Sequence, residues 1–167
     1  MRQHQGRQQP LYTSAQRQRR DASRWTLVQG VLAPLQFLVF AVSLGLVLRT
    51  LATGEGAAAA NASVVAKTLV LYAIMVTGSI WEKVVFGRYL FAPAFFWEDV
   101  FSMLVLGLHT AYLAALGLRL LDTQGLLVLA LAAYATYLIN AGQFLLKLRA
   151  ARLEAPASLA FAGETAR

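Results

Sequence analysis

Five ionisable side chains lie close together in the sequence, in the stretch from Trp81 to His109. They are Glu82, Lys83, Glu98, Asp99 and His109, and most of their neighbours are aromatic or aliphatic. Carboxyl groups and imidazole are the side chains that most often transfer protons in general acid–base catalysis. The stretch therefore indicates proton-transfer or ligand-binding chemistry, provided that the fold brings these groups together.

Helical spacing relates these groups to one another. Glu98 and His109 are eleven residues apart, so on a helix they share one face and lie about 16 Å apart along the axis, with Asp99 turned about 100° from Glu98. Asp99 could also simply stabilise the first turn of its helix, and Glu82 could form a weak surface ion pair with Lys83. His109 is either functional, since ionisable groups inside a membrane usually are, or a neutral imidazole bonded to a neighbouring helix.

Composition indicates what surrounds these residues. The 167 residues are 58% hydrophobic and only 14% charged, with a mean hydropathy of +0.56, whereas soluble domains contain about 25% charged residues. We therefore expect an integral membrane protein. There is no cysteine, which excludes disulfides and thiolate chemistry, and two histidines leave little scope for a multi-histidine metal site.

Four apolar segments predict an all-α, four-helix membrane bundle. They cover about residues 25–48, 63–81, 100–118 and 126–146, and each is long enough to cross a bilayer. The predicted organisation is a flexible basic arm over 1–24, a membrane domain over 25–148 and a tail over 149–167. A short connection around 87–93 would bring Glu82 and Glu98 to the same membrane level.

Basic residues predict the orientation of the bundle. Twelve lie in the arm, the second connection and the C-terminal segment, whereas the first and third connections contain only Arg49 and Arg119. The positive-inside rule then places both termini in the cytoplasm. The basic arm leads directly into an apolar span, so we expect it to face anionic lipid and not nucleic acid.

Polar residues inside the predicted spans suggest how the helices meet. Gln29, Gln36 and Ser43 recur every seven residues and should point into the bundle. Lys67 lies near the start of the second predicted span, where a lysine can extend to the headgroups. The fourth span carries a polar stripe that either joins helices or, through Tyr137 and Asn140, binds a polar ligand; its members are Thr136, Tyr137, Asn140, Gln143 and Lys147.

Aromatic residues around the second connection allow two interpretations. They can form a belt at the membrane interface, or they can line a site for a flat apolar ligand. The residues are Trp81, Phe86, Tyr89, Phe91, Phe95, Phe96 and Trp97, of which Phe95, Phe96 and Trp97 are expected at the interface. No P-loop, dinucleotide fingerprint, nucleophile elbow or HExxH motif is present.

Three segments resemble a known family. DASRWTLVQGVLAPLQFLVF, the long block from VVAKTLVLYAIMV to GLHTAYL, and AYATYLINAGQFLLKLRAARL are similar to the 3-vinyl bacteriochlorophyllide hydratases of phototrophic bacteria. The resemblance covers about residues 10–153. It implies addition of water to the C3 vinyl group of chlorophyllide a or a bacteriochlorophyllide, giving the 3-(1-hydroxyethyl) pigment, which a dehydrogenase then oxidises. It also implies the bacterial cytoplasmic or intracytoplasmic membrane as the location.

The implied chemistry suggests roles for the residues. Burial disfavours an ionised carboxyl, so Glu98 or Glu82 would protonate the vinyl group while Asp99 assists or positions water. His109 would bind the pigment, either as a magnesium ligand or at the ring edge, and Lys83 or Arg88 would bind its carboxylate. The remaining expected substrate contacts are Trp81, Phe96, Trp97, Tyr137 and Asn140.

No cofactor and no metal ion of the protein's own is expected for a hydration. The partners expected are the pigment, membrane lipid and neighbouring pigment-biosynthesis enzymes. The alternative function is a non-catalytic subunit that binds or assembles a tetrapyrrole in the membrane. A small transporter has weaker support, because the sequence contains no pair of broken helices.

Overall fold

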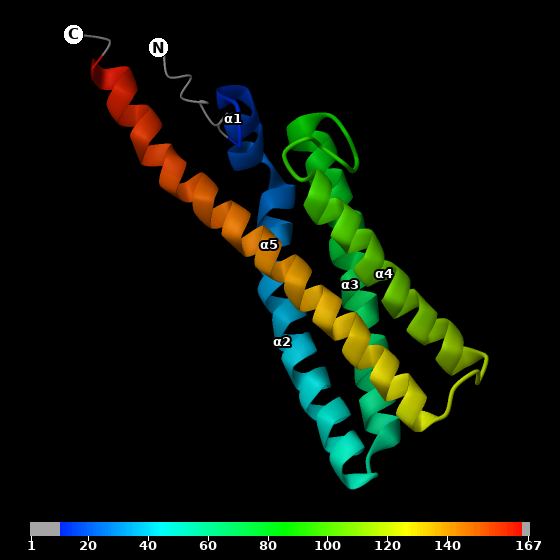
Figure 1. Cartoon of the computed structure of the whole chain (residues 1–167). Helices are drawn as coiled ribbons and strands as arrows, with labels where there is room; N and C mark the ends of the chain where they lie inside the picture. The colour runs from blue at the N-terminus through cyan, green and yellow to red at the C-terminus, as the bar shows by residue number, and fades with distance from the viewer. Residues whose placement is uncertain (1–10, 165–167) are drawn as a thin grey trace, which may run out of the picture.

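The computed structural model describes residues 11–164, and the side chains of residues 11–152. The described chain consists of helices joined by short turns, with no strand (Figure 1). The helices are Ser14–Ala22 (α1), Arg24–Thr53 (α2), Ala57–Phe86 (α3), Phe96–Gly117 (α4) and Thr123–Glu164 (α5). Arg2, Arg7 and Arg167, which contribute to the predicted charge pattern, lie outside the described residues.

Four of these helices are long and apolar enough to cross a membrane. They are Arg24–Thr53, Ala57–Phe86, Phe96–Gly117 and the Thr123–Arg152 part of α5. The shortest, with 22 residues, extends about 33 Å, which exceeds the hydrocarbon core of about 30 Å. The predicted all-α membrane bundle is confirmed. Each long helix begins before its predicted span, and all of them except α4, which ends at Gly117, also end after it. Within the arm, Ser14–Ala22 form a helix of their own.

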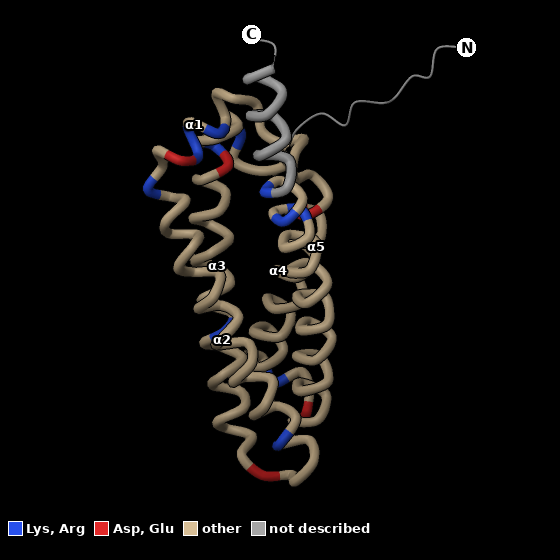
Figure 2. Tube along the Cα trace, turned by 90° about the vertical axis from the view of Figure 1, so that its left-hand side faces the viewer, with Lys and Arg blue, Asp and Glu red and all other residues tan. Residues whose placement is uncertain are grey.

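The four long helices form two antiparallel hairpins. α2 packs mainly against α3, and α4 packs mainly against α5. Figure 1 shows α1, the connection between α3 and α4 and the C-terminal part of α5 at the same end of the bundle. Lys and Arg residues gather at this end, which we call the basic end, as Figure 2 shows. Lys67 is the only charged residue buried in the middle of a described span.

Glycines allow the tight connections between helices. Gly54 and Gly56, with φ of 75° and 84°, turn the chain between α2 and α3, and Gly87, with φ of 83°, ends α3. These left-handed conformations are accessible to glycine at little cost. The Gly87 N–H donates to the Lys83 carbonyl, so the end of α3 is capped immediately before the connection that leads to α4.

The inner faces of the helices follow helical periodicity. The buried face of α4 contains Glu98, Asp99, Ser102, Val105, His109, Tyr112 and Ala115. This confirms that Glu98 and His109 share one face. On α2, Gln36 and Ser43 are buried, and Gln29 donates to Thr77 of α3 over 2.7 Å. The large apolar side chains that remain exposed, such as Leu38 and Leu146, are suited to contact lipid.

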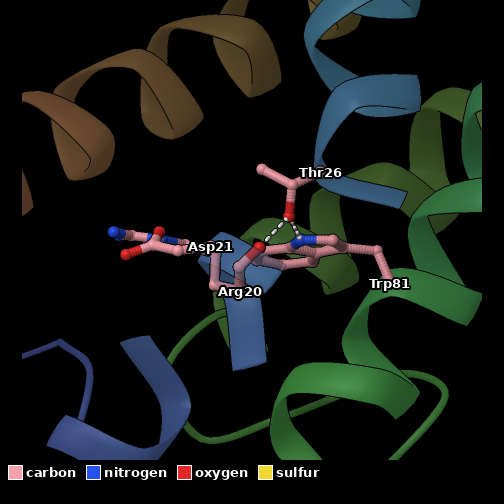
Figure 3. Close-up of polar contacts among 4 residues, drawn as sticks. All are labelled: Arg20, Asp21, Thr26 and Trp81. Carbon is pink, nitrogen blue, oxygen red and sulfur yellow. Dashed lines mark hydrogen bonds and ion pairs between the residues drawn. The ribbon is translucent and has the colours of Figure 1, made fainter. Parts of the chain in front are cut away.

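At the basic end, α1 is held against the start of α2 and the end of α3. The Thr26 hydroxyl donates to the Arg20 carbonyl over 2.6 Å and accepts from the Trp81 indole N–H over 3.0 Å (Figure 3). Tyr12 stacks on Phe86 with ring centroids 5.7 Å apart. Thr26 therefore joins three helices beside the segment that holds the candidate acids.

Candidate active site

Three buried carboxyl groups meet at the basic end of the bundle. Glu82 lies in the last turn of α3, and Glu98 and Asp99 lie in the first turn of α4. All three are at least nine-tenths buried, with 4%, 7% and 5% exposed. We call them the carboxylate cluster. The short connection between α3 and α4 brings them together, as the sequence predicts.

The side chains of Glu82 and Asp99 lie close enough to hydrogen-bond to each other. Two carboxyl groups can form such a bond only if one of them carries a proton, because an ionised carboxylate has no donor. The Phe91 N–H also donates to Asp99 Oδ2 over 2.7 Å, and the Ala92 N–H donates to Glu82 Oε2 over 3.5 Å. The geometry therefore provides two buried, adjacent carboxyl groups that could share a proton.

The connection between α3 and α4 has an unusual backbone at this pair. Phe91 has φ of 58°, a conformation that is uncommon for a bulky side chain and that costs about 1–3 kcal/mol. The conformation directs the Phe91 N–H to Asp99. Sequence reasoning assigned Phe91 only to the aromatic group. Pattern and spacing give no signal for a backbone donor of this kind.

Glu98 has a different partner from the other two acids. The Lys147 ammonium donates to Glu98 Oε2 over 2.6 Å and lies 5.1 Å from the centre of the Phe95 ring. The cluster thus combines two adjacent carboxyl groups with a third carboxyl group that is ion-paired.

The polar stripe on α5 contacts α4 and α2. Asn140 Nδ2 donates to Ser102 Oγ over 2.8 Å, which matches the prediction that such residues join helices. The Tyr137 ring packs 4.9 Å from the Phe40 ring. A ligand-binding role for Asn140 and Tyr137 stays a prediction.

Lys67 does not extend to the membrane surface, so that expectation is wrong. Its side chain is fully buried, and Nζ donates to His109 Nε2 over 2.8 Å. The His109 Nδ1–H donates to the Val105 carbonyl over 2.8 Å, which fixes the imidazole tautomer and leaves Nε2 as the acceptor. Nζ also lies 4.0 Å from the Tyr137 ring centre. Both ring nitrogens of His109 are therefore occupied.

The expected aromatic contacts divide into buried and exposed residues. Phe96 and Trp97 are exposed at the start of α4, with 44% and 68% of their surface accessible, as expected of an interfacial belt. Phe95 is 1% exposed and packs with Tyr12 and Val85, so its expected place at the interface is wrong. It is buried because the connection folds it beneath α1 and α5.

The two expected cationic contacts are exposed at the same end. Lys83 Nζ donates to the Gly87 carbonyl over 2.9 Å and lies 5.3 Å from the Tyr89 ring centre, and Arg88 is exposed. Neither Lys83 nor Arg88 forms an ion pair with Glu82 in the part of the chain that the structure describes. Among the described residues no group of three His, Asp or Glu side chains is arranged to hold a metal ion.

An all-helical membrane bundle with a buried carboxylate cluster near one end defines a class of protein suited to proton-transfer chemistry on a membrane-soluble ligand. Comparison with known proteins is more specific. The family model described as 2-vinyl bacteriochlorophyllide hydratase matches residues 12–150, so the chain belongs to this family. No solved structure matches the chain.

Two curated relatives are named 2-vinyl bacteriochlorophyllide hydratase. The protein of Cereibacter sphaeroides is 72% identical over 149 residues, which cover 89% of this chain and 92% of the relative. The protein of Rhodobacter capsulatus is 68% identical over 145 residues, which cover 87% of this chain and 84% of the relative. The resemblance inferred from the sequence is confirmed.

Proposed function

We propose that this protein is a hydro-lyase of bacteriochlorophyll biosynthesis that adds water to the vinyl group of a bacteriochlorophyllide or chlorophyllide a. The two curated relatives carry this activity in their names. Position 2 in those names is C3 in the current tetrapyrrole numbering. The observation that carries the proposal is the buried pair of Glu82 and Asp99, beside the ion pair of Glu98 and Lys147.

The reaction needs one acid and one base. The shared proton of Glu82 and Asp99 goes to the terminal carbon of the vinyl group, which becomes a methyl group. The adjacent carbon, attached to the ring, then bears positive charge that is delocalised into the macrocycle. Water bonds to this carbon, and its proton returns to the cluster, through Glu98 or the deprotonated pair. The product is the 1-hydroxyethyl pigment, and the cluster is restored.

Burial supports this assignment. A carboxyl that is 4% or 5% exposed is poorly solvated, so its neutral form is favoured, and a neutral acid is what an alkene requires. General acid–base groups of this kind contribute about 10²–10⁴-fold to rate. The backbone donors of Phe91 and Ala92 hold the pair in place at the level where a membrane-soluble pigment meets the interface.

The pigment contacts follow from the same position. The exposed rings of Phe96 and Trp97, with Trp81 nearby on α3, would pack against the macrocycle, and Lys83 or Arg88 would bind its carboxylate as a charge-assisted hydrogen bond. Tyr137 and Asn140 lie deeper. Magnesium ligation by His109 requires Lys67 to leave Nε2, and it stays a prediction that is tested below.

The membrane placement is also part of the proposal. The basic end faces the cytoplasm, because that end carries α1, Lys83, Arg88 and the basic part of α5, and positive residues are retained on the cytoplasmic side. The protein then lies in the bacterial cytoplasmic membrane or its intracytoplasmic extension. The hydroxyethyl product would pass to a neighbouring dehydrogenase of the same synthesis.

The product of the reaction tests the proposal. Membranes that contain the protein are incubated with chlorophyllide a in water labelled with ¹⁸O, without added cofactor, and the pigment is analysed by mass spectrometry. We expect a product heavier by one labelled water, with the label in the new hydroxyl. Pigment that binds to the membranes and keeps its mass would instead support the non-catalytic tetrapyrrole-binding subunit.

A further inference from the structure

Four buried polar atoms on α2 and α5 have no hydrogen-bond partner within the described part of the chain. They are both amide atoms of Gln36, Oδ1 of Asn140 and Oε1 of Gln143. Gln36 is 3% exposed and Asn140 is 9% exposed. Leaving such atoms unpaired in an apolar interior is costly, and most buried polar groups in proteins do have a partner. We therefore expect these atoms to have a partner that the described residues do not supply.

Gln36 and Asn140 lie at the same depth in the bundle. The rings of Phe40 and Tyr137 pack 4.9 Å apart and give a common reference level. Gln36 precedes Phe40 by four residues on α2, and Asn140 follows Tyr137 by three on the antiparallel α5. Along the helix axes, Gln36 therefore lies about 6 Å, and Asn140 about 4.5 Å, closer to the basic end than the Phe40–Tyr137 contact.

The same group of residues reaches the carboxylate cluster. Asn140 Nδ2 donates to Ser102 Oγ, and Ser102 follows Asp99 by three residues on the buried face of α4, so the two side chains are neighbours on the helix surface. Gln143 lies between Asn140 and Lys147, the partner of Glu98. We call Gln36, Ser102, Asn140 and Gln143 the inner polar site.

We propose that the inner polar site binds water within the membrane bundle and supplies the water that is added to the substrate. This rests on the proposed function. The Gln36 amide offers two N–H donors, and the carbonyls of Gln36, Asn140 and Gln143 offer acceptors, which matches the hydrogen bonds that a water molecule makes in a protein. The site contains no charged group, so it favours a small neutral molecule.

Chemical labelling tests for water at this site without relying on activity. The chain has no cysteine, so single cysteines can be introduced as Gln36→Cys and, as a control, Val47→Cys. Val47 is fully buried in the apolar core of the same helix and lies closer to a helix end than Gln36. The probe is a small ammonium-bearing methanethiosulfonate, which reacts with thiols that water can reach.

We expect Gln36→Cys to be modified in the folded protein while Val47→Cys stays unmodified. Equal resistance of the two thiols would mean that the site is dry and would overturn the proposal. This outcome is independent of the proposed function: if the wild-type protein makes no hydroxyethyl product, the hydratase assignment fails, whereas the labelling result still decides whether the site holds water.

Activity and stability together test whether this water is the one that reacts. Gln36→Leu removes the unpaired atoms with little change in volume. We expect the hydration rate to fall about 10²-fold, the loss that misplacement of a reactant produces, while pigment binding is unchanged and the melting temperature is unchanged or higher. The control is Gln29→Leu, which removes a glutamine bonded to Thr77 and should lower the melting temperature but keep the hydration rate.

Two results would contradict the assignment. A Gln36→Leu protein that hydrates at the wild-type rate would show that water at Gln36 is not the reacting water. A Gln36→Leu protein that loses pigment affinity in proportion to its rate would identify Gln36 as a pigment contact instead.

Discussion

The buried face of α4 carries two groups of ionisable side chains that have very different surroundings. Near the basic end, Glu98 and Asp99 meet Glu82 beside a connecting segment. Near the middle of the bundle, His109 meets Lys67 among helices on every side. Both groups are buried, so burial alone does not identify the reacting one.

The two groups differ in how their hydrogen-bonding capacity is used. His109 has both nitrogens bonded, and the Lys67 ammonium lies between the His109 ring and the Tyr137 ring, so no position is left for a substrate unless the pair separates. Glu82 and Asp99 instead lie within hydrogen-bonding reach of each other and accept backbone N–H groups from a strained connection. Connections of this kind can move, whereas packed helices resist movement. We therefore infer that Glu82 and Asp99 are suited to proton transfer, whereas Lys67 and His109 are suited to holding the two hairpins together.

The largest expected effect of a substitution is a loss of hydration rate at the carboxylate cluster. Glu82→Gln keeps the size of the side chain and a hydrogen bond to Asp99 but removes the transferable proton. We expect the initial rate of hydration to fall about 10²–10⁴-fold, with the protein still folded. The control is Glu55→Gln, which changes an exposed acid at the opposite end of the bundle and should leave the rate unchanged. A Glu82→Gln protein that hydrates at the wild-type rate would show that Glu82 does not supply the proton.

The next largest expected effect is a loss of stability at the pair of Lys67 and His109. His109→Leu leaves the buried Lys67 Nζ without its acceptor, and a buried donor that loses its partner costs about 1–3 kcal/mol of unfolding free energy. Adding Lys67→Met should restore much of this loss, because the unpaired buried donor is then gone. Unfolding in detergent micelles measures both variants.

The same pair of variants tests magnesium ligation. If His109→Leu were as stable as the wild-type protein, the holding role would be contradicted. If the folded double variant bound pigment with a shifted absorption spectrum, His109 would be identified as a ligand of the pigment's magnesium.

The smallest effect concerns the link between the carboxylate cluster and α5. Lys147→Met removes the ion pair with Glu98, and because the Lys147 side chain is 27% exposed, solvent weakens the pair to about 1 kcal/mol. Arg149→Met, a change of an exposed cation two residues later, should alter stability less. Chemical denaturation of both variants measures the difference. Equal losses would mean that the ion pair adds nothing specific.

Sequence periodicity predicted the parts of this molecule that depend on one helix at a time. The shared face of Glu98 and His109 follows from the helical repeat, and the four spans follow from apolar length. The position of Lys67 was misjudged because the predicted span begins at 63, whereas α3 begins at Ala57. Lys67 therefore lies about 15 Å from the start of α3, and its side chain points into the bundle, where it meets His109.

The parts that depend on contacts between helices could not be predicted in the same way. Phe95 belongs to a run of aromatic residues and has no feature that distinguishes a buried ring from an interfacial one; the docking of α1 through Tyr12 decides its place. The N–H of Phe91 is available to Asp99 because of a positive φ, which an aromatic residue gives no reason to expect. Pairing of Lys67 with His109 likewise requires the relative depth of two helices.

The account depends most on a proton held by Glu82 and Asp99. Infrared difference spectra of the wild-type protein against Glu82→Gln and Asp99→Asn, at neutral pH and without pigment, measure it directly. We expect a carbonyl band of a protonated carboxyl in the wild-type protein that is absent or displaced in both variants and shifts in heavy water. Spectra that contain only carboxylate bands for these two residues would contradict the account.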